Sequence, residues 1–427
     1  MEILYIGSLC DEEWFSSTHK KNGLPSRVAQ YNFEKALMEG FIENDIINID
    51  VNYLYQEDYF PKGNHLLFRK KVRKLNKKLN VNYLSYINIP FVKEIYLLIK
   101  GIILTLQWVK KHNIKREKLI LTAFNYTPFS LGVLIASRLF KVKRINIFTD
   151  LSSDIINPTR QRNMSRIKRI ILPVYMKLVN IVEKNFDGYV LFTELMNSKV
   201  NPYRKPSVVV EGIYCNDLGL LSVPKSRAIM YAGTLNFEYG VKNILDAFEQ
   251  IEDPSLELWL FGDGDMRNYI EEITSIDPRV KYFGFMRREE VFEYEKKALL
   301  LLNVRDANDE FTKYSFPSKT FEYMASGTPF LTTKLECIPK EYYKYLYLAD
   351  SSSPSQLKNI INEILSKPSV ELDEIGNKAR EFVLTKKNSK FQTEKIIRMI
   401  HEEILNNRNR ETSINNWSSR GKVNGNN

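Results

Sequence analysis

The segment Leu299–Leu331 joins two short apolar runs through one helical pattern, which limits the folds open to the chain. Leu299–Val304 has the length of a buried strand. Pro317 suits the first turn of a helix, because its missing N–H would be unpaired there anyway. Gly327 and Pro329 predict the end of that helix, and a second strand should follow directly. Strand, helix and strand in this order are typical of a parallel sheet with helices on its faces.

The start of this helix offers groups suited to a nucleotide diphosphate. Lys319 lies in the first turn, Glu322 lies one turn further on, and Ser315 or Ser318 can cap the helix. A helix that begins at the carboxyl end of a parallel strand points its free N–H groups into the ligand crevice. A cation there suits phosphate, and a carboxylate can accept ribose hydroxyls. The segment by itself also fits an ordinary capped helix with solvated side chains.

Glycine turns follow three more predicted strands in the second half, at Gly233, Gly262 and Gly284. Because helical patterns separate these strands, the succession predicts a doubly wound parallel sheet. Each turn alone is weak evidence, but their order together with the helix start is a strong joint signal. In the first half, the strand Ile3–Ile6 resembles a Rossmann-type start, but its turn lacks G-x-G-x-x-G.

The sequence from Ser315 to Gly327, SFPSKTFEYMASG, resembles the nucleotide-sugar motif of glycosyltransferase family four. It is most similar to the subgroup that builds bacterial capsules and exopolysaccharides. This resemblance implies the GT-B fold, in which two Rossmann-like domains face a central cleft and a C-terminal helix crosses back to the first. It also implies a retaining, metal-independent hexosyltransferase with no cofactor beyond its co-substrate, a nucleotide diphosphate sugar expected to be UDP-linked. The resemblance is firm over Ala228–Asp350.

The same resemblance assigns roles to individual residues. Glu322 is expected to hold the ribose, and the nucleobase is expected to pack against Gly284 and Phe285. The rest of the donor is expected to lie near Gly233, Thr234, Gly262, Ser315, Ser318 and Lys319.

Three positions depart from the family pattern. An Arg and a Lys that contact the diphosphate in most members are replaced by Thr234 and Tyr239, and the first Glu of the family pair falls at Tyr314. The capsular subgroup often lacks the Arg and Lys too. Arg305 and Lys319 are therefore the predicted catalytic cations that stabilise charge on the departing phosphate.

Two candidate residues lie in the first half of the chain. Gly23 precedes the helical pattern Arg27–Met38, which is expected to end at Gly40, and the resemblance suggests that its loop approaches the donor phosphates. The alternative is a plain loop. Asp150 follows the strand Arg144–Phe148, and the resemblance makes it the candidate that orients or deprotonates the acceptor hydroxyl. It is equally suited to capping the next turn.

The length of 427 residues favours two domains, because one core rarely supports so long a chain. We expect an acceptor-binding domain over residues 1–215 and a nucleotide-sugar domain over residues 216–389. Residues 390–406 should form the helix that returns to the first domain, and residues 407–427 should be a disordered tail. Three distant cysteines and four scattered histidines argue against disulfides and a metal site and favour a reducing cytoplasm.

The net charge of +11 is unevenly distributed. Residues 1–216 contain 33 Lys and Arg against 19 Asp and Glu, a net charge of +14, and the remainder has a net charge of −3. This local positive charge is compatible with three interpretations: binding to an anionic membrane surface, binding to nucleic acid, or a charged face that is simply solvated. No nucleic-acid-binding module accompanies the charge, and we favour the membrane because the predicted site suggests lipid-linked sugar chemistry. Val92–Val109 and Ser165–Lys184 are helical patterns that suit either the core or a membrane interface.

Together these observations predict a cytoplasmic enzyme, peripheral on the inner face of a bacterial membrane. Its expected acceptor is a saccharide linked to polyprenyl diphosphate, in capsule, exopolysaccharide or O-antigen biosynthesis. No apolar run reaches the ~18 residues that a membrane-spanning helix requires. A GT-B nucleotide-sugar epimerase, a catalytically inactive subunit and a basic nucleic-acid-binding protein are the alternatives.

Overall fold

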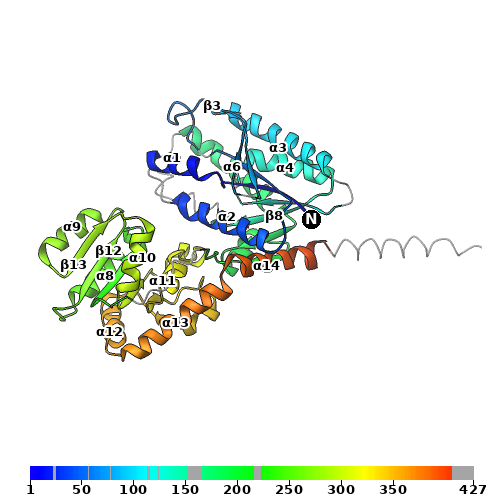
Figure 1. Ribbon diagram of the computed structural model, residues 1–427. Helices are drawn as coiled ribbons and strands as arrows, with labels where there is room; N and C mark the ends of the chain where they lie inside the picture. Colours follow the sequence, from blue (N-terminus) through cyan, green and yellow to red (C-terminus); the bar gives the residue numbers. More distant parts are fainter. Residues whose placement is uncertain are drawn as a thin grey trace, which may run out of the picture. The chain divides into compact units, whose positions relative to one another are not determined.

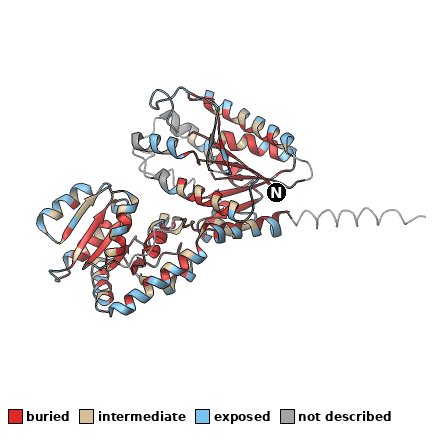
Figure 2. Ribbon diagram, in the orientation of Figure 1, coloured by how far each residue is buried: buried red, intermediate tan, exposed pale blue. Residues whose placement is uncertain are grey.

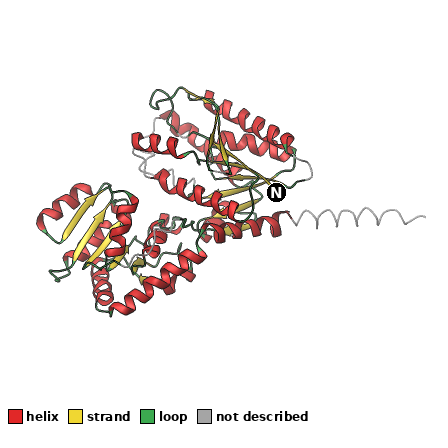
Figure 3. Cartoon of the chain, viewed as in Figure 1, coloured by secondary structure: helices red, strands yellow, loops and turns green. Residues whose placement is uncertain are grey.

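The computed structural model describes residues 1–22, 26–55, 57–76, 78–112, 116–123, 125–151, 166–215 and 223–405. The chain divides into two compact units, one comprising residues 1–211 with 389–427 and the other residues 212–388. Each unit has a largely parallel sheet flanked by helices (Figure 1, Figure 3). The predicted tail at residues 407–427 lies outside the described residues.

The first unit is organised around a sheet whose strands, among the described residues, follow the order β10-β9-β8-β7-β1-β2-β5-β4. Among the described strands of this sheet, only β4 runs antiparallel, pairing with β5. The six residues of β1 are all buried, because helices cover both faces of a parallel sheet. The strands are β1 (Glu2–Gly7), β2 (Ile49–Tyr53), β4 (Lys71–Lys74), β5 (Asn80–Tyr83), β7 (Lys118–Thr122), β8 (Lys143–Phe148), β9 (Gly188–Leu191) and β10 (Ser207–Val209). A separate antiparallel pair is formed by β3 (Leu67–Phe68) and β6 (Tyr86–Ile87).

The helices of the first unit pack closely where glycines remove side chains. A Cβ atom on Gly101 would lie 2.4 Å from the Phe129 carbonyl oxygen, and one on Gly132 would lie 2.1 Å from the Leu98 carbonyl oxygen. The two helices that carry these glycines therefore approach backbone to backbone. The helices are α1 (Glu12–Asn22), α2 (Ser26–Glu43), α3 (Val92–Lys111), α4 (Thr127–Leu139), α6 (Arg166–Glu183), α7 (Glu194–Val200) and α14 (Ser389–Met399), which continues as a π-helix over Ile400–Leu405.

Gly40 does not end a helix, contrary to the prediction. Helix α2 continues through it to Glu43. A Cβ atom at Gly40 would lie 2.2 Å from the Ser389 carbonyl oxygen at the start of α14. The glycine is therefore explained by the close approach of α14 to α2, which lie side by side in the first unit (Figure 1).

The second unit has a fully parallel sheet in the order β13-β12-β11-β14-β15-β16. Its strands are β11 (Ala228–Ala232), β12 (Glu257–Phe261), β13 (Val280–Gly284), β14 (Leu300–Asn303), β15 (Phe330–Thr333) and β16 (Tyr347–Ala349). Its helices are α8 (Val241–Glu249), α9 (Arg267–Ile276), α10 (Arg288–Lys297), α11 (Lys319–Ser326), α12 (Pro354–Leu365) and α13 (Ser369–Lys386). Short 3-10 turns lie at Phe237–Tyr239, Glu310–Lys313 and Lys340–Tyr345.

The central strands of this second sheet are buried (Figure 2), and apolar side chains pack on both of its faces. Alternate residues of β11 point to opposite sides, so Met230 belongs to one core cluster and Ile229 to the other. The strand order reverses direction between β11 and β14, which is the arrangement of a dinucleotide-type doubly wound sheet. The predicted doubly wound sheets are confirmed.

Candidate functional site

The crevice of the second unit is expected where its strand order reverses, at the carboxyl ends of β11 and β14. Gly233 follows β11 directly, and Arg305 lies two residues beyond β14. Sequence reasoning selected both positions, and the sheet brings them to the same edge. Neighbouring strands of a parallel sheet end on one side, so the turns after β12 and β13 lie on this edge too.

Three of the predicted glycines form a continuous backbone line along the edge. The Gly233 N–H donates to the Phe261 carbonyl oxygen at 3.0 Å, and the Gly262 N–H donates to the Gly284 carbonyl oxygen at 2.8 Å. Gly262 has φ +125°, and a Cβ atom there would lie 1.8 Å from the Gly233 carbonyl oxygen. Only glycine combines that backbone angle with such a close contact.

Phe285 and Thr234 lie at the solvent side of these turns. Phe285 follows β13 and is 80% exposed, and a Cβ atom at the preceding Gly284 would have no neighbour within 4 Å. Thr234 is exposed, and its carbonyl oxygen accepts a hydrogen bond from the Tyr231 hydroxyl at 3.0 Å. An exposed aromatic ring beside open space is a surface on which a planar base can stack.

Helix α11 begins at Lys319, two residues later than Pro317 would have allowed. The Pro317 carbonyl oxygen instead accepts a hydrogen bond from the Thr320 N–H at 3.0 Å. Ser318 occupies the N-cap position without making a side-chain capping bond, so the predicted cap is wrong for this residue. The Thr320 hydroxyl is buried and has no hydrogen-bond partner among the described residues. Anion binding at this helix start would depend on the first backbone N–H groups, which lack intrahelical partners in any α-helix.

Glu322 is held between two cations. Its Oε1 accepts a short hydrogen bond from Arg288 Nε, and its Oε2 accepts one from Lys319 Nζ at 2.6 Å. Lys319 Nζ also lies 3.5 Å from Oε1 of Glu295, a fully buried residue on α10. Two carboxylates and two cations thus form one cluster, which we call the Glu322 network.

The pKa values within the Glu322 network diverge. Burial opposes ionisation of Glu322, but the charges of Lys319 and Arg288 outweigh it and lower the pKa of Glu322 to about 2. Burial raises the pKa of Glu295 to about 7; the attraction of Lys319 and Arg288 does not offset it, and the charge of Glu322 adds to it. Lys319 loses hydration, but the two carboxylates nevertheless raise its pKa. Glu322 is therefore a permanent carboxylate at neutral pH.

Arg305 connects two other parts of the predicted site. Its guanidinium lies 4.9 Å from the ring centroid of Tyr239, and its Nη1 donates to the Ser315 carbonyl oxygen at 3.4 Å. Its Nε is buried without a hydrogen-bond partner among the described residues. The structure thus brings Arg305 to the loop after β11 and to the segment before α11. Lys319, by contrast, is committed to the two carboxylates of the Glu322 network.

Two of the predicted site residues belong to the first half of the chain. Asp150 is exposed, two residues beyond β8, and Gly23 lies outside the described residues. At the carboxyl end of β1, the buried carboxylate of Glu34 accepts a hydrogen bond from the Ser8 N–H at 2.9 Å and another from the Tyr5 hydroxyl at 2.8 Å. Burial raises the pKa of Glu34.

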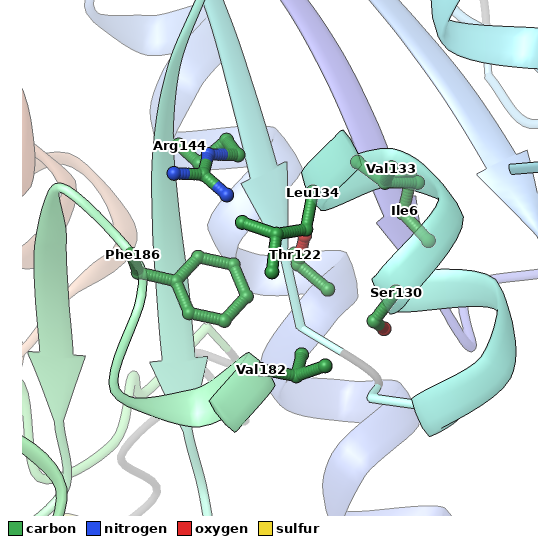
Figure 4. Close-up of a pocket in the computed structure, with 8 residues that line it drawn as sticks. All are labelled: Ile6, Thr122, Ser130, Val133, Leu134, Arg144, Val182 and Phe186. Carbon is green, nitrogen blue, oxygen red and sulfur yellow. The ribbon is translucent and has the colours of Figure 1, made fainter. Parts of the chain in front are cut away.

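A small cavity in the core of the first unit is a different kind of site (Figure 4). Arg144 and Phe186 project into it, and Arg144 Nε lies 3.6 Å from Asp187 Oδ2. Burial lowers the pKa of Arg144. Most of the lining is apolar and buried, so we assign this cavity to the core rather than to substrate binding. The lining residues are Ile6, Thr122, Ser130, Val133, Leu134, Arg144, Val182 and Phe186.

The described ranges contain neither a cluster of metal ligands nor a membrane-spanning helix. Within those ranges, no three His, Cys, Asp or Glu side chains cluster as metal ligands would. None of the helices described is both long enough and apolar enough to cross a membrane.

Sequence reasoning missed Arg288 and Glu295. Both belong to a segment that reads as a charged surface helix, Arg287–Lys297. For Glu295, the sequence does contain a signal. It lies three residues after Phe292 and four residues after Val291, so it falls on the buried stripe of α10. A carboxylate on an apolar stripe needs a charged partner, and Lys319 is that partner.

Residues 220–382 match a family model described as glycosyl transferases group 1. The match lies within the second unit and includes the Glu322 network. No sequence among the curated proteins matches the chain.

Solved structures resemble the whole chain at low sequence identity. A glycosyltransferase from Rickettsia africae has a TM-score of 0.62 and 12% identity, covering 94% of this chain and 98% of its own. Sucrose-phosphate synthase from Thermosynechococcus elongatus has a TM-score of 0.60 and 14% identity, covering 94% and 99%. Anabaena HepE in complex with UDP has a TM-score of 0.60 and 14% identity, covering 94% and 100%. These similarities show that the chain has the GT-B fold, as predicted.

Proposed function

We propose that this GT-B chain is a retaining, metal-independent glycosyltransferase that uses a UDP-linked sugar. The observation that carries the proposal is the permanently ionised Glu322 one turn into α11, at the edge where the sheet order reverses. A carboxylate there can accept both hydroxyls of a ribose, while the first turn of α11 offers N–H groups to the diphosphate. The family match over the same residues supports this assignment.

In this proposal the remaining site residues bind different parts of the donor. The base stacks near Gly284 and Phe285, and the diphosphate lies against Gly233, Thr234, Gly262, Ser315 and Ser318. Arg305 faces the leaving phosphate, because its guanidinium already spans the loops that carry Tyr239 and Ser315. When the bond between the sugar and the phosphate breaks, negative charge moves to the phosphate, and a fixed cation stabilises it. The departing phosphate then takes the proton of the acceptor hydroxyl, which Asp150 orients.

We further propose that the acceptor is a saccharide on polyprenyl diphosphate, in capsule, exopolysaccharide or O-antigen synthesis at the inner membrane face. Helix α3 supports a membrane partner for the first unit. Its buried stripe contains Leu97, Gly101 and Trp108. Its opposite stripe is apolar but exposed by 41–64% at four positions, and the preceding Phe91 is 71% exposed. The four residues are Val92, Ile95, Ile99 and Ile103.

The sequence that leads into this helix and forms its first half has the charge that anionic lipids attract. Residues 57–103 contain ten Lys and Arg against three Asp and Glu. An apolar stripe with a cationic surrounding is suited to the interface of an anionic bilayer. Flotation with vesicles of phosphatidylglycerol and phosphatidylcholine tests this surface. Ile95→Glu combined with Ile99→Glu should abolish binding, whereas Ile276→Glu, at an exposed isoleucine of the second unit, should leave it intact.

The donor site is tested by thermal unfolding of the purified chain with a panel of nucleotides and nucleotide sugars. A ligand at a hundredfold excess over Kd stabilises the folded state by about 2.7 kcal/mol. We expect stabilisation by UDP and by one or more UDP-sugars, and its loss in Glu322→Gln. If only polynucleotides stabilise the protein, a nucleic-acid-binding function replaces the proposed one.

Product analysis separates the remaining alternatives. Transfer of radiolabelled sugar to a lipid extract establishes a transferase, whereas conversion of the nucleotide sugar without an acceptor indicates an epimerase. If UDP binds but neither product forms with any donor or extract, the chain is an inactive subunit. The departures at Thr234, Tyr239 and Tyr314 make this control necessary.

A further inference from the structure

Both oxygens of Glu322 are occupied by protein cations. Arg288 Nε lies at Oε1 and Lys319 Nζ at Oε2. The carboxylate side chain is only 10% exposed, whereas the two cationic side chains are 33% and 28% exposed. The two cationic side chains are thus more exposed than the carboxylate that they bind. A ribose that presents hydroxyls to this carboxylate meets donors that already bind both oxygens, and it can compete with Lys319 for Oε2.

A second carboxylate is placed to receive Lys319. Neither oxygen of Glu295 has a hydrogen-bond partner among the described residues, although the residue is fully buried. Its Oε1 lies 3.5 Å from Lys319 Nζ, just beyond hydrogen-bond range. A buried ionised carboxylate without hydrogen bonds is strongly disfavoured. Closing this gap would remove that penalty, and it requires a shift of Nζ by roughly 0.7 Å, to the usual ~2.8 Å of such pairs.

We propose that Glu295 is a positioning residue that takes Lys319 from Glu322 when the ribose of the nucleotide binds. The inference rests on the proposed function, because it assumes that Glu322 holds the ribose. A ribose hydroxyl then donates to Oε2 of Glu322, and Lys319 Nζ pairs with Oε1 of Glu295. Arg288 remains on the other oxygen of Glu322, so the carboxylate keeps one neutralising charge throughout the exchange.

The exchange couples nucleotide binding to a proton. The charged or titratable groups that face Glu295 are Lys319, Glu322 and Tyr323 from α11 and Arg288 from its own helix. Burial holds the pKa of Glu295 at about 7, so part of the population is protonated at neutral pH. Pairing with Lys319 favours the carboxylate, and binding therefore releases up to one proton. The affinity for nucleotide should rise as the pH increases through 7.

Ribose discrimination tests the exchange directly. Calorimetry on the full chain compares UDP with 2′,3′-dideoxy-UDP, which lacks both hydroxyls. We expect the wild type to prefer UDP at least tenfold. Glu295→Gln should reduce this preference at least fivefold while binding dideoxy-UDP within twofold of the wild type. Glu293→Gln, at an exposed glutamate of the same helix that pairs with Lys296, is the matched control and should behave as the wild type.

Proton release provides a second readout that a merely structural role would not change. UDP binding is measured at pH 7 in two buffers with different ionisation enthalpies. Ionisation of UDP itself contributes equally to all variants, so the wild type should release more protons than Glu295→Gln, and Glu295→Asp should restore part of the difference.

The outcomes separate this inference from the proposed function. Absence of UDP binding, or equal binding of the two nucleotides by the wild type, overturns the proposed function and this inference with it. If the wild type discriminates and Glu295→Gln retains its full preference and proton release, only the exchange is refuted. An equal loss of affinity for both nucleotides in Glu295→Gln assigns this residue a structural role and also refutes the exchange.

Discussion

Replacement of Glu295 by Gln should stabilise the protein at alkaline pH and have little effect at acidic pH. The substitution keeps the shape of the side chain and removes the ionisable group. In the folded state, burial raises the pKa of Glu295 from 4.5 to about 7. Between these two values the unfolded chain carries an ionised Glu295, whereas the folded chain still holds the proton. Wild-type stability therefore falls as pH rises across this interval.

The magnitude follows from the size of the shift. Each pKa unit corresponds to about 1.4 kcal/mol, so the rise from 4.5 to about 7 is equivalent to about 3 kcal/mol. Glu322 contributes in the opposite direction, because its pKa is lowered to about 2. Its contribution is fully present above pH 4.5 and is lost only as the pH falls toward 2. The window from pH 5 to 8 thus isolates Glu295 within the Glu322 network.

The assay is thermal unfolding of wild type and Glu295→Gln at several pH values from 5 to 8, without nucleotide. Other titrating groups affect both proteins equally and cancel in the difference. For a unit of this size, 1 kcal/mol shifts Tm by about 2–4 °C. The Tm of the variant should therefore gain about 5–10 °C on the wild type across the window. Parallel curves would refute the reasoning, because they would show that Glu295 has the same pKa in both states.

Further substitutions test the geometry of both units. Arg288→Leu removes one of the two cations at Glu322, so the pKa of Glu322 should rise, measurable by carbon-13 NMR titration, and UDP affinity should fall at least tenfold. Gly262→Ala should destabilise the second unit by about 3 kcal/mol or more in chemical denaturation, because the new Cβ meets a backbone oxygen at positive φ. Gly284 also has positive φ, but an added Cβ would have no neighbour within 4 Å. Gly284→Ala should therefore lower the free energy of unfolding by only about 1–2 kcal/mol. Gly132→Ala should destabilise the first unit by about 1–3 kcal/mol, and unchanged stability would contradict the close packing of α3 on α4.

The alternation of strands and helices in the second unit was predictable because its strands are buried on both faces. Such strands read as apolar runs, as at Leu300–Leu302 and Leu258–Phe261, and a glycine turn follows several of them. The strands between residues 57 and 90 were not predicted. β4 has the sequence KVRK and alternates between half-buried and exposed residues at the sheet edge, so its pattern resembles a basic loop.

The chemistry of the site was only partly predictable. Glu322 and Lys319 stand in one motif, three residues apart, so the sequence alone brings them together. Arg288 and Glu295 come from another helix, and their contact with α11 depends on how the two helices pack on the sheet. Gly40 shows the same limit, because its neighbour is 349 residues away in the chain at Ser389. Long-range contacts of this kind leave no local pattern.

The buried carboxylate of Glu34 has a consequence for stoichiometry. It already satisfies the Ser8 N–H at the carboxyl end of β1, where the sheet of the first unit also reverses its order. A phosphate arriving there would compete with a carboxyl group tethered to the same chain, whose effective concentration exceeds that of any free nucleotide. Both units have a doubly wound sheet, but in the first unit the Glu34 side chain already accepts the hydrogen bond of the Ser8 N–H at the strand end. Nucleotide titration should therefore saturate at one equivalent per chain.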